Sequence, residues 1–247
     1  MDRFVFISAS SAKQVQFAQA VNAHNLANAS TVGFKQDMVD AETVYLKGAG
    51  QDSRAYNVIR DTPVDLRDGL LEQTGRDLDI AINGAGWFAV QGEDGTEQLT
   101  RRGDLRVDEF GQLVNGQGQA LLGNAGPIAL PPFQSLSIAS DGTISIVPLG
   151  ELPNAVAALD RIKMVNPPTE SLRKTETGVI QSDDGLPAAA DGSVQLTTGA
   201  LESSNVNPIT AMVHMIELAR QFEHHMKMVQ MGQEIGTASA SLMRLQS

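Results

Sequence analysis

Cysteine is absent from the 247-residue sequence, and aromatic residues make up only 4% of it. Without cysteine the chain can form no disulfide framework, no thiolate zinc site and no cysteine nucleophile. Basic residues are also scarce, because 18 Lys and Arg stand against 29 Asp and Glu, for a formal net charge of −11. Nucleic-acid binding needs clustered Lys and Arg, so we expect no nucleic-acid partner.

Long hydrophobic runs are missing as well. No stretch approaches the roughly 18 apolar residues of a membrane-spanning helix, so we expect no membrane insertion. The short apolar run Phe4–Ile7 is followed by Lys13, Gln14 and Gln16, which interrupt any signal-peptide core. We therefore expect no cleaved signal peptide.

Recognisable catalytic and metal-binding motifs are lacking too. The four histidines, His24, His214, His224 and His225, form no H-E-x-x-H motif. His214 and His225 share a helix face but lie about 16 Å apart along the helix, too far to bind one metal ion. No G-x-S-x-G elbow is present. The sequence predicts no catalytic residue, no metal site and no cofactor, and hence a protein that is not an enzyme.

Two long helices are predicted at the ends of the chain. Apolar residues at helical spacing, with no Pro or Gly up to residue 32, predict a helix over 2–28 that ends near Asn28, with Gly33 just beyond it. Asn207 as N-cap and Pro208 as first residue begin a second helix over 208–245. An antiparallel pair of two helices makes a thin core, so we expect the remaining apolar faces to contact other chains.

Residues 77–200 are predicted to be β-structure, because short apolar runs alternate with Asn-Gly and Asp-Gly turns. The expected strands are 78–82, 87–90, 105–107, 112–114, 120–122, 136–138, 143–147, 161–165, 178–181 and 193–196. This spacing favours a sandwich or barrel. The predicted fold class is α+β, with an N-terminal helix in 1–35, an extended or loop connector in 36–76, the β-rich domain in 77–200 and a C-terminal helix in 201–247.

Charge and side-chain type distinguish the ends from the middle. Residues 1–35 carry one acid and three bases, and residues 201–247 carry four acids and three bases, so the negative charge belongs to the middle. Six of the nine methionines lie in the last helix, as ordinary core or as an adaptable packing surface. Asn22 and Asn25 either lie in a fraying helix end or fix helix register through buried hydrogen bonds.

Three segments together resemble flagellar axial proteins, the rod and hook family. They are NLANASTVGFK at 25–35, LDIAINGAGWF at 78–88 and GALESSNVN at 199–207. Within the rod proteins, residues 1–3, 125–131 and 161–165 are more similar to the proximal rod subtype, and the distal rod subtype is the alternative. A secreted β-domain enzyme or a glycan-binding module is a third reading, which exposed aromatic side chains in a groove would support.

The resemblance implies a structural subunit of the basal-body rod, located across the periplasm. Such proteins are exported by the flagellar type III apparatus without a cleaved signal peptide, and their terminal helices pair as a coiled coil. They assemble with other proximal and distal rod subunits into a shaft that transmits torque. The residues expected at the assembly interface are Ile7, Val15, Asn25, Leu26, Asn28, Gly33, Phe34, Asn205, Met212, Met215, Ile216, Phe222 and Met226.

Overall fold

A computed structural model describes residues 2–45, 55–61, 63–152, 154–175, 179–182 and 185–244. The chain forms two compact units, each built from segments that are far apart in sequence. Unit 1 consists of Met1–Ala29, Asp37–Asp65 and Val206–Ser247, and unit 2 of Ser30–Gln36 and Leu66–Asn205. A helix lies near each end of the chain and strands fill the middle, as the α+β prediction requires.

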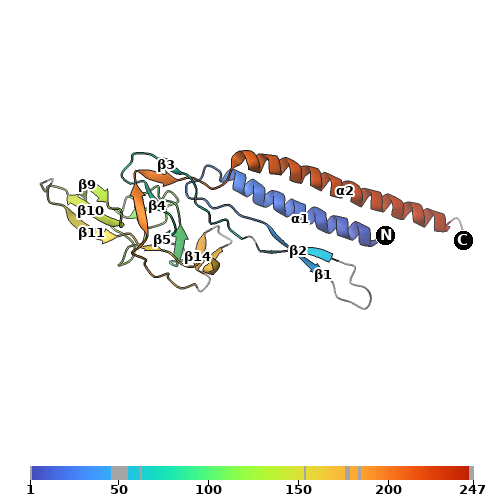
Figure 1. The fold of residues 1–247 in the computed structure, drawn as a ribbon, viewed down its shortest axis with the longest axis horizontal. Coiled ribbons are helices and arrows are strands. Elements are labelled where there is room, and N and C mark those ends of the chain that lie inside the picture. The colour runs from blue at the N-terminus through green and yellow to red at the C-terminus, as the bar shows by residue number, and fades with distance from the viewer. Residues whose placement is uncertain are drawn as a thin grey trace. The chain divides into compact units, whose positions relative to one another are not determined.

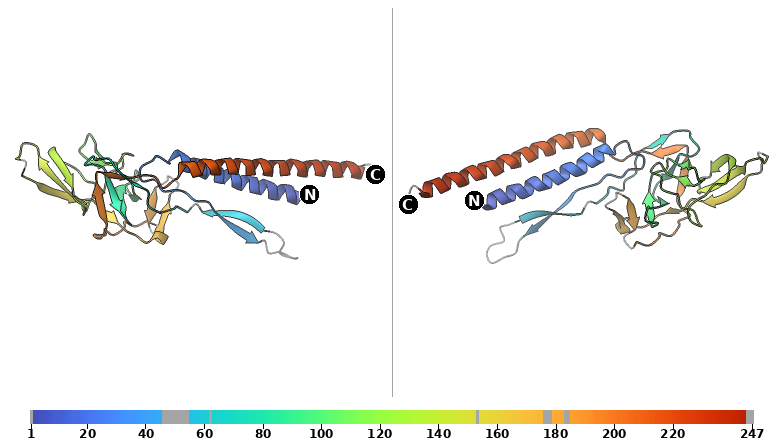
Figure 2. Two further views of the ribbon diagram at one scale, coloured as in Figure 1. Left: turned by 45° about the horizontal axis from the view of Figure 1, so that its top comes forward. Right: turned by 180° about the vertical axis from the view of Figure 1, so that it is seen from behind.

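Unit 1 contains the two long helices, which lie side by side and run in opposite directions (Figures 1 and 2). They are α1 (Asp2–Ala27) and α2 (Pro208–Arg244), so both predicted helices are confirmed to within one residue at each end. The Asn207 Oδ1 accepts hydrogen bonds from the amides of Ile209 and Thr210, at 3.0 and 3.1 Å. These two bonds satisfy otherwise free amides of the first turn, which explains why α2 begins there.

A two-stranded ribbon also belongs to unit 1. Strand β1 (Asp40–Tyr45) pairs antiparallel with β2 (Ala55–Asp61), which follows it along the chain. Neither strand is predicted from the sequence, because residues 36–76 show mixed patterns that indicate an extended or loop connector. The structure distributes that region between both units, with Asp37–Asp65 in unit 1 and the remainder in unit 2.

Unit 2 is built from short strands, and every pairing between them is antiparallel. Its largest sheet has the order β12-β5-β6-β14-β13, and a second sheet has the order β11-β10-β9. Three two-stranded pairs complete the unit: β16 with β3, β15 with β4, and β7 with β8. The strands are β3 (Leu71–Gln73), β4 (Ile80–Asn83), β5 (Trp87–Gln91), β6 (Glu97–Thr100), β7 (Arg106–Val107), β8 (Leu113–Val114), β9 (Phe133–Ile138), β10 (Thr143–Pro148), β11 (Ala157–Arg161), β12 (Met164–Val165), β13 (Leu172–Lys174), β14 (Ile180–Ser182), β15 (Gln195–Thr198) and β16 (Ala200–Glu202). A 3-10 turn, η1 (Thr169–Ser171), precedes β13.

Strand β5 lies at the centre of the core because both of its faces are covered. Phe88 and Val90 belong to the larger hydrophobic cluster, while Trp87 and Ala89 point into a second cluster. Alternate residues of a strand point to opposite faces, so β5 joins the two clusters. The predicted run 87–90 is therefore a strand buried on both sides.

The predicted turns are confirmed more fully than the predicted strands. Gly84, Gly95 and Gly142 each follow Asn or Asp and have positive φ, as tight hairpin turns require. Residues 120–122 form only isolated bridges instead of the expected strand, because each contacts a different segment. Strand β6 was missed, since its sequence Glu-Gln-Leu-Thr has little apolar content.

Residues 30–36 belong to unit 2 although they lie just after α1. The Gly33 amide donates to the Glu202 carbonyl oxygen at 2.7 Å, and the Gln36 amide donates to Asn205 Oδ1 at 2.8 Å. The Lys35 Nζ contacts the Glu202 carboxylate at 2.7 Å. The unit boundary therefore lies between residues 29 and 30 and does not coincide with the end of the segment that was assigned to the N-terminal helix.

Two truncations test this boundary. Deleting residues 1–29 should leave unit 2 folded, whereas deleting 1–36 should lower its free energy of unfolding by about 3–5 kcal/mol, because Glu202 loses its buried partner Lys35. Urea unfolding followed by fluorescence measures this, since the single tryptophan, Trp87, is buried in unit 2. Equal stability of the two truncated chains would contradict the assignment of 30–36 to unit 2.

Candidate assembly surfaces and a buried charge cluster

The face on which α1 meets α2 combines small and polar side chains with larger apolar ones. On α1 the buried residues include Ser8, Ala12 and Asn22, and on α2 Ala211 and Leu218. Small side chains let two helix backbones approach closely, but they bury little apolar surface. The Asn22 Nδ2 donates to the Ala211 carbonyl oxygen at 2.8 Å, which fixes the register of the pair at one position.

Buried and half-buried positions on α2 recur at alternating intervals of four and three, at residues 211, 215, 218, 222, 225, 229, 232 and 236. On α1 they form a broader band, at residues 5, 8, 10–12, 14, 15, 18, 19, 21, 22, 25 and 26, which contains the row 5, 8, 12, 15, 19, 22 and 26. The expected interface residues Val15, Leu26, Met215 and Phe222 lie on these rows and are half-buried. The chain itself therefore covers part of each of these four side chains.

Apolar side chains outside these rows are exposed. Among the expected interface residues, Ile7, Met212, Ile216 and Met226 are 40–56% exposed. The structure adds exposed residues that the prediction missed: Phe6, Phe17, Ile209, Val213, Met228, Met231 and Ile235. Ile209, Met212, Val213 and Ile216 follow the spacing i, i+3, i+4, i+7, so they form one apolar stripe on the outside of α2. Contiguous exposed apolar patches of this kind mark protein contacts.

Asn25 and Asn28 make hydrogen bonds within unit 1. The Asn25 side chain bonds both backbone groups of Asp37, with Nδ2 donating to the carbonyl oxygen at 2.8 Å and Oδ1 accepting from the amide at 2.9 Å. His24 Nδ1 lies 2.9 Å from Asp37 Oδ2. The Asn28 Nδ2 donates to the His24 carbonyl oxygen at 2.9 Å. Asn25 thus ties the end of α1 to the start of the segment that leads into β1, and Asn22 has the register role that the sequence analysis considered.

Gly33, Phe34 and Asn205 make their described contacts within unit 2. Gly33 has φ +68°, and a Cβ there would lie 2.5 Å from the Arg101 backbone, so no other residue fits without a shift. The Phe34 carbonyl oxygen accepts from the Asn205 amide at 3.3 Å. The Asn205 Nδ2 donates to the Arg67 carbonyl oxygen at 3.1 Å. The unit 2 parts of the two signature segments, 30–35 and 199–205, therefore meet one another.

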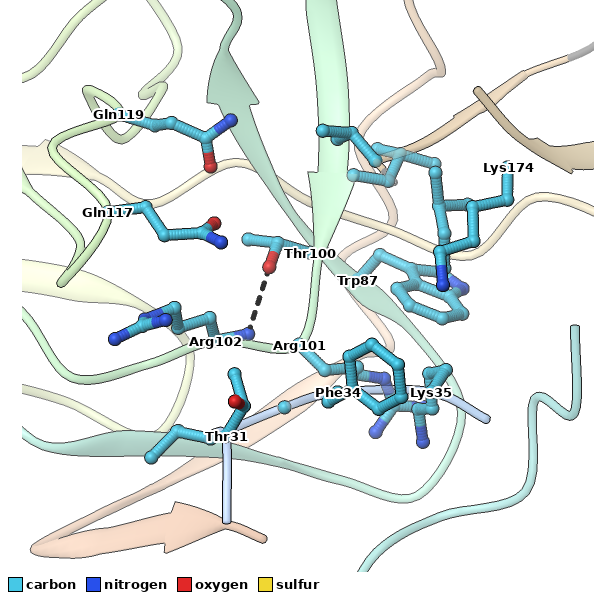
Figure 3. A pocket seen from close by; sticks show the side chains of 15 residues that line it. Thr31, Phe34, Lys35, Trp87, Thr100, Arg101, Arg102, Gln117, Gln119 and Lys174 are labelled. Atoms are coloured by element: carbon cyan, nitrogen blue, oxygen red, sulfur yellow. Dashed lines mark hydrogen bonds between the residues drawn. The ribbon is translucent and has the colours of Figure 1, made fainter. Parts of the chain in front are cut away.

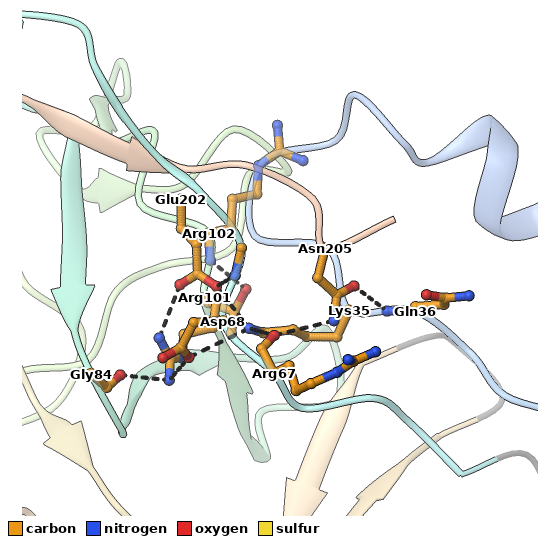
Figure 4. A network of polar contacts seen from close by, with 11 residues as sticks. Lys35, Gln36, Arg67, Asp68, Gly84, Arg101, Arg102, Glu202 and Asn205 are labelled. Atoms are coloured by element: carbon orange, nitrogen blue, oxygen red, sulfur yellow. Dashed lines mark hydrogen bonds and ion pairs between the residues drawn. The ribbon is translucent and has the colours of Figure 1, made fainter. Parts of the chain in front are cut away.

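A cluster of buried charges lies where these two segments meet (Figure 4). Glu202 is 1% exposed, and its two carboxylate oxygens contact Lys35 Nζ at 2.7 Å and Arg101 Nη1 at 2.9 Å. The Gly69 amide also donates to Glu202 Oε1, and Arg101 Nη2 lies 3.1 Å from Asp68 Oδ1. Charges taken out of water are costly unless they are paired and hydrogen-bonded, and here each of the three buried charged groups has a partner.

Trp87 contributes a second kind of contact to the cluster. The Arg101 ζ-carbon lies 5.1 Å from the centroid of the Trp87 ring, and Lys35 Nζ lies 6.0 Å from it. Cations at such distances are attracted to the face of an indole. Burial lowers the pKa of Lys35 below its usual 10.5, while the hydrogen bond and the charge of Glu202 oppose this shift.

A small cavity of about 90 Å³ adjoins the cluster between residues 31–35 and the main sheet (Figure 3). Its uncharged polar lining comes from Thr31, Thr100, Gln117 and Gln119, and its charged lining is basic, from Lys35, Arg101, Arg102 and Lys174. Among these described residues there is no His, Asp or Glu that could act as a base toward a hydroxyl nucleophile. The described residues contain no group of three or more His, Asp or Glu placed to hold a metal ion. Trp87 and Phe88 are buried, so neither presents the exposed ring that a glycan-binding module would use.

In the described part of the chain, neither helix is long and apolar enough to cross a membrane. Two features stand out: a buried charge cluster in unit 2 and exposed apolar side chains on both helices. These features are typical of a structural protein that assembles with other chains.

Comparison with known proteins agrees with this class. Residues 197–242 match the family described as "Flagellar basal body rod FlgEFG protein C-terminal", and residues 81–146 match "Flagellar hook protein FlgE/F/G D1 domain". The relatives named flagellar basal-body rod protein FlgF from Salmonella typhimurium and from Escherichia coli are each 37% identical over 235 residues, 93% of both chains. FlgG of Bacillus subtilis is 31% identical over 264 residues, covering 95% of this chain and 97% of its own. The chain belongs to the flagellar basal-body rod protein family, and its 37% identity to these two FlgF proteins exceeds the 29–32% identity to the FlgG relatives.

The substitution Glu202→Gln tests the charge cluster. It removes the negative charge between Lys35 and Arg101 while keeping the size of the side chain, so we expect unit 2 to lose about 3–5 kcal/mol of unfolding free energy. Trp87 fluorescence in a urea titration measures the loss. The matched control is Glu72→Gln on the neighbouring strand β3, where the side chain is exposed and the change should stay within about 0.5 kcal/mol. Similar effects of both substitutions would show that the cluster adds no stability.

The lowered pKa of Lys35 predicts a pH dependence. Below pH 10.5 the unfolded chain holds the Lys35 proton more tightly than the folded chain, so the contribution of Lys35 to stability rises with pH in the window below 10.5. The unfolding free energy of the native chain minus that of Lys35→Met should therefore increase from about pH 7 to about pH 10. A decrease would mean that the ion pair with Glu202 outweighs burial.

Proposed function

We propose that this chain is a non-catalytic, structural subunit of the flagellar basal-body rod, of the proximal, FlgF-like type. The observation that carries the proposal is the division of the helix surfaces into two kinds. The rows shared by α1 and α2 hold buried small and polar residues together with half-buried apolar ones, whereas Ile7, Met212, Ile216 and Met226 are 40–56% exposed. Apolar surface that the chain does not cover itself is available to other axial subunits.

The helix pair is proposed to act as a coiled coil. The alternating three- and four-residue intervals on α1 and α2 are the spacing of a heptad seam. Within this proposal the seam residues Val15, Leu26, Met215 and Phe222 hold the pair together, and the exposed apolar residues contact neighbouring subunits. Asn25, Asn28, Gly33, Phe34 and Asn205 then support assembly indirectly, because they fix the chain where α1 ends and α2 begins.

Localisation and partners follow from family membership. We expect the chain in the periplasm-spanning part of the basal body, in contact with proximal and distal rod subunits. Export through the flagellar type III apparatus, without a cleaved signal peptide, is part of the same proposal. Torque passes through such a subunit only if its helices are stiff, and close packing of many side chains gives that stiffness.

A second candidate is a distal, FlgG-like rod subunit. The identity to FlgG relatives extends over nearly the whole chain, which is the observation that favours it. Labelling the chain in isolated basal bodies separates the two candidates, because proximal and distal subunits occupy different positions along the rod.

The apolar stripe on α2 can be tested by the double substitution Met212→Glu and Ile216→Glu. Both side chains are more than half exposed and lie outside the seam with α1, so the fold should tolerate the change, with an unfolding free energy within about 1 kcal/mol of the native value. Incorporation into isolated basal bodies and swimming should be lost, because charges on the stripe oppose burial against another subunit.

The matched control for that test is Leu149→Glu. Leu149 is 70% exposed, as an apolar side chain after β10 in unit 2, away from either helix in sequence. It should keep both incorporation and swimming. If the α2 variant entered basal bodies as well as the control, the proposed assembly surface would be wrong.

A further inference from the structure

The sequence contains two Asn-Gly pairs, Asn83-Gly84 and Asn115-Gly116. Asparagine followed by glycine is the pair most prone to spontaneous loss of ammonia, because glycine leaves its own backbone nitrogen unhindered. The reaction needs the asparagine side chain to be free and the backbone to be able to rearrange. The two pairs differ strongly in both respects, so each serves as a control for the other.

Asn83 has the properties of a reactive site. It is the exposed last residue of β4, and its side chain makes no hydrogen bond to the part of the chain that the structure describes. Gly84 has φ +84° in the turn to β5, and nothing lies within 4 Å of the place where a Cβ would stand. No packing therefore covers the Asn83 amide group or the Cα of Gly84, while the backbone on either side is held by the pairing of Asn83 with Gln195 of β15 and by the Arg101 hydrogen bond to the Gly84 carbonyl oxygen.

Asn115 has the opposite properties. It is fully buried, and its Oδ1 accepts hydrogen bonds from the amides of Gln117 and Gln119, both at 3.0 Å. Its Nδ2 donates to Gln119 Oε1 at 2.9 Å. A Cβ on Gly116 would lie 2.0 Å from Asp104 Oδ2, so the backbone there is also crowded. Reaction at Asn115 requires local unfolding first.

We propose that Asn83-Gly84 is a site of spontaneous deamidation and isomerisation in the folded protein. The Gly84 backbone nitrogen loses its proton to hydroxide and attacks Asn83 Cγ, and the bond from Cγ to Nδ2 breaks. The nitrogen leaves as ammonia after taking up a proton, and a five-membered imide remains. Water then opens the imide at one of its two carbonyl groups, giving aspartate or isoaspartate. No reactant other than water is consumed.

The isoaspartate product disturbs the charge cluster, whereas aspartate leaves the backbone unchanged. The Arg101 Nη2 donates to the Gly84 carbonyl oxygen at 2.9 Å, and Arg101 in turn contacts Glu202 (Figure 4). Isoaspartate carries an extra methylene in the backbone between residues 83 and 84, so it displaces this carbonyl oxygen from Arg101. A chemical change at an exposed turn thereby alters the hydrogen bonding of Arg101, which belongs to a buried ion pair.

The experiment incubates the purified full chain at mildly alkaline pH and follows both pairs by peptide mass spectrometry. Fragmentation that distinguishes aspartate from isoaspartate identifies the products. We expect conversion at Asn83 to be at least about tenfold faster than at Asn115 while the chain is folded, and the two rates to converge in urea, where local unfolding no longer protects Asn115. An unchanged Asn83 in the folded chain, or equal rates at the two sites, would overturn the proposal.

Two variants separate the chemistry from its structural effect. Asn83→Gln slows ring closure, because the imide would have six members, and should abolish the modification at this position. Asn83→Asp supplies the aspartate product with a normal backbone. Aged native protein should unfold at lower urea than Asn83→Asp, since only the former contains isoaspartate. Equal midpoints would overturn the link to Arg101.

Discussion

The ion pair between Glu202 and its two cations is the contact on which unit 2 depends. Lys35 comes from the segment after α1, Arg101 follows β6, and Glu202 ends β16, so three distant parts of the sequence are held by one carboxylate. An unpaired charge at this depth would be strongly destabilising, which makes the three residues interdependent. The Trp87 ring lies against the Arg101 guanidinium, and the Gly33 backbone lies against the Arg101 backbone. These two contacts restrict the position of Arg101 further.

In unit 1, the two helices differ in the side chains that they bury against each other and those that they expose. Their most deeply buried positions include Ser8, Ala12 and Asn22, which allow close approach and a defined register. Half-buried apolar residues such as Met215 and Phe222 lie on the same rows. Further apolar residues, among them Met212 and Ile216, remain exposed and are available for contacts with other chains. The proposed role in the rod accounts for why the chain leaves this surface uncovered.

Sequence patterns predicted some of this architecture well. The ends of both helices and the glycine turns follow from local rules, namely a capping Asn207, helical periodicity and positive φ after Asn or Asp. Strand β6 is short and mostly polar, and β16 has only three residues, so neither carries a periodic signal. The charge cluster was missed because isolated Lys, Arg and Glu residues usually lie in solvent, and nothing local shows that three of them meet. The seam on α1 was predicted only in part: Val15 and Leu26 lie on it, but Ser8 and Ala12 are not apolar enough to stand out, and Ile7, which is, lies outside it.

The pairing of Lys35 with Glu202 also affects how fast unit 2 can fold. The two residues are 167 positions apart, and closing a loop of that length costs on the order of 4–5 kcal/mol of chain entropy before the contact is made. Proteins dominated by such distant pairings fold slowly. Segment 30–36 has no buried counter-charge until residue 202 is present, so unit 2 can complete its fold only when nearly all of the chain is available. The large separation of Lys35 and Glu202 in sequence therefore makes their pairing a late step in the folding of unit 2.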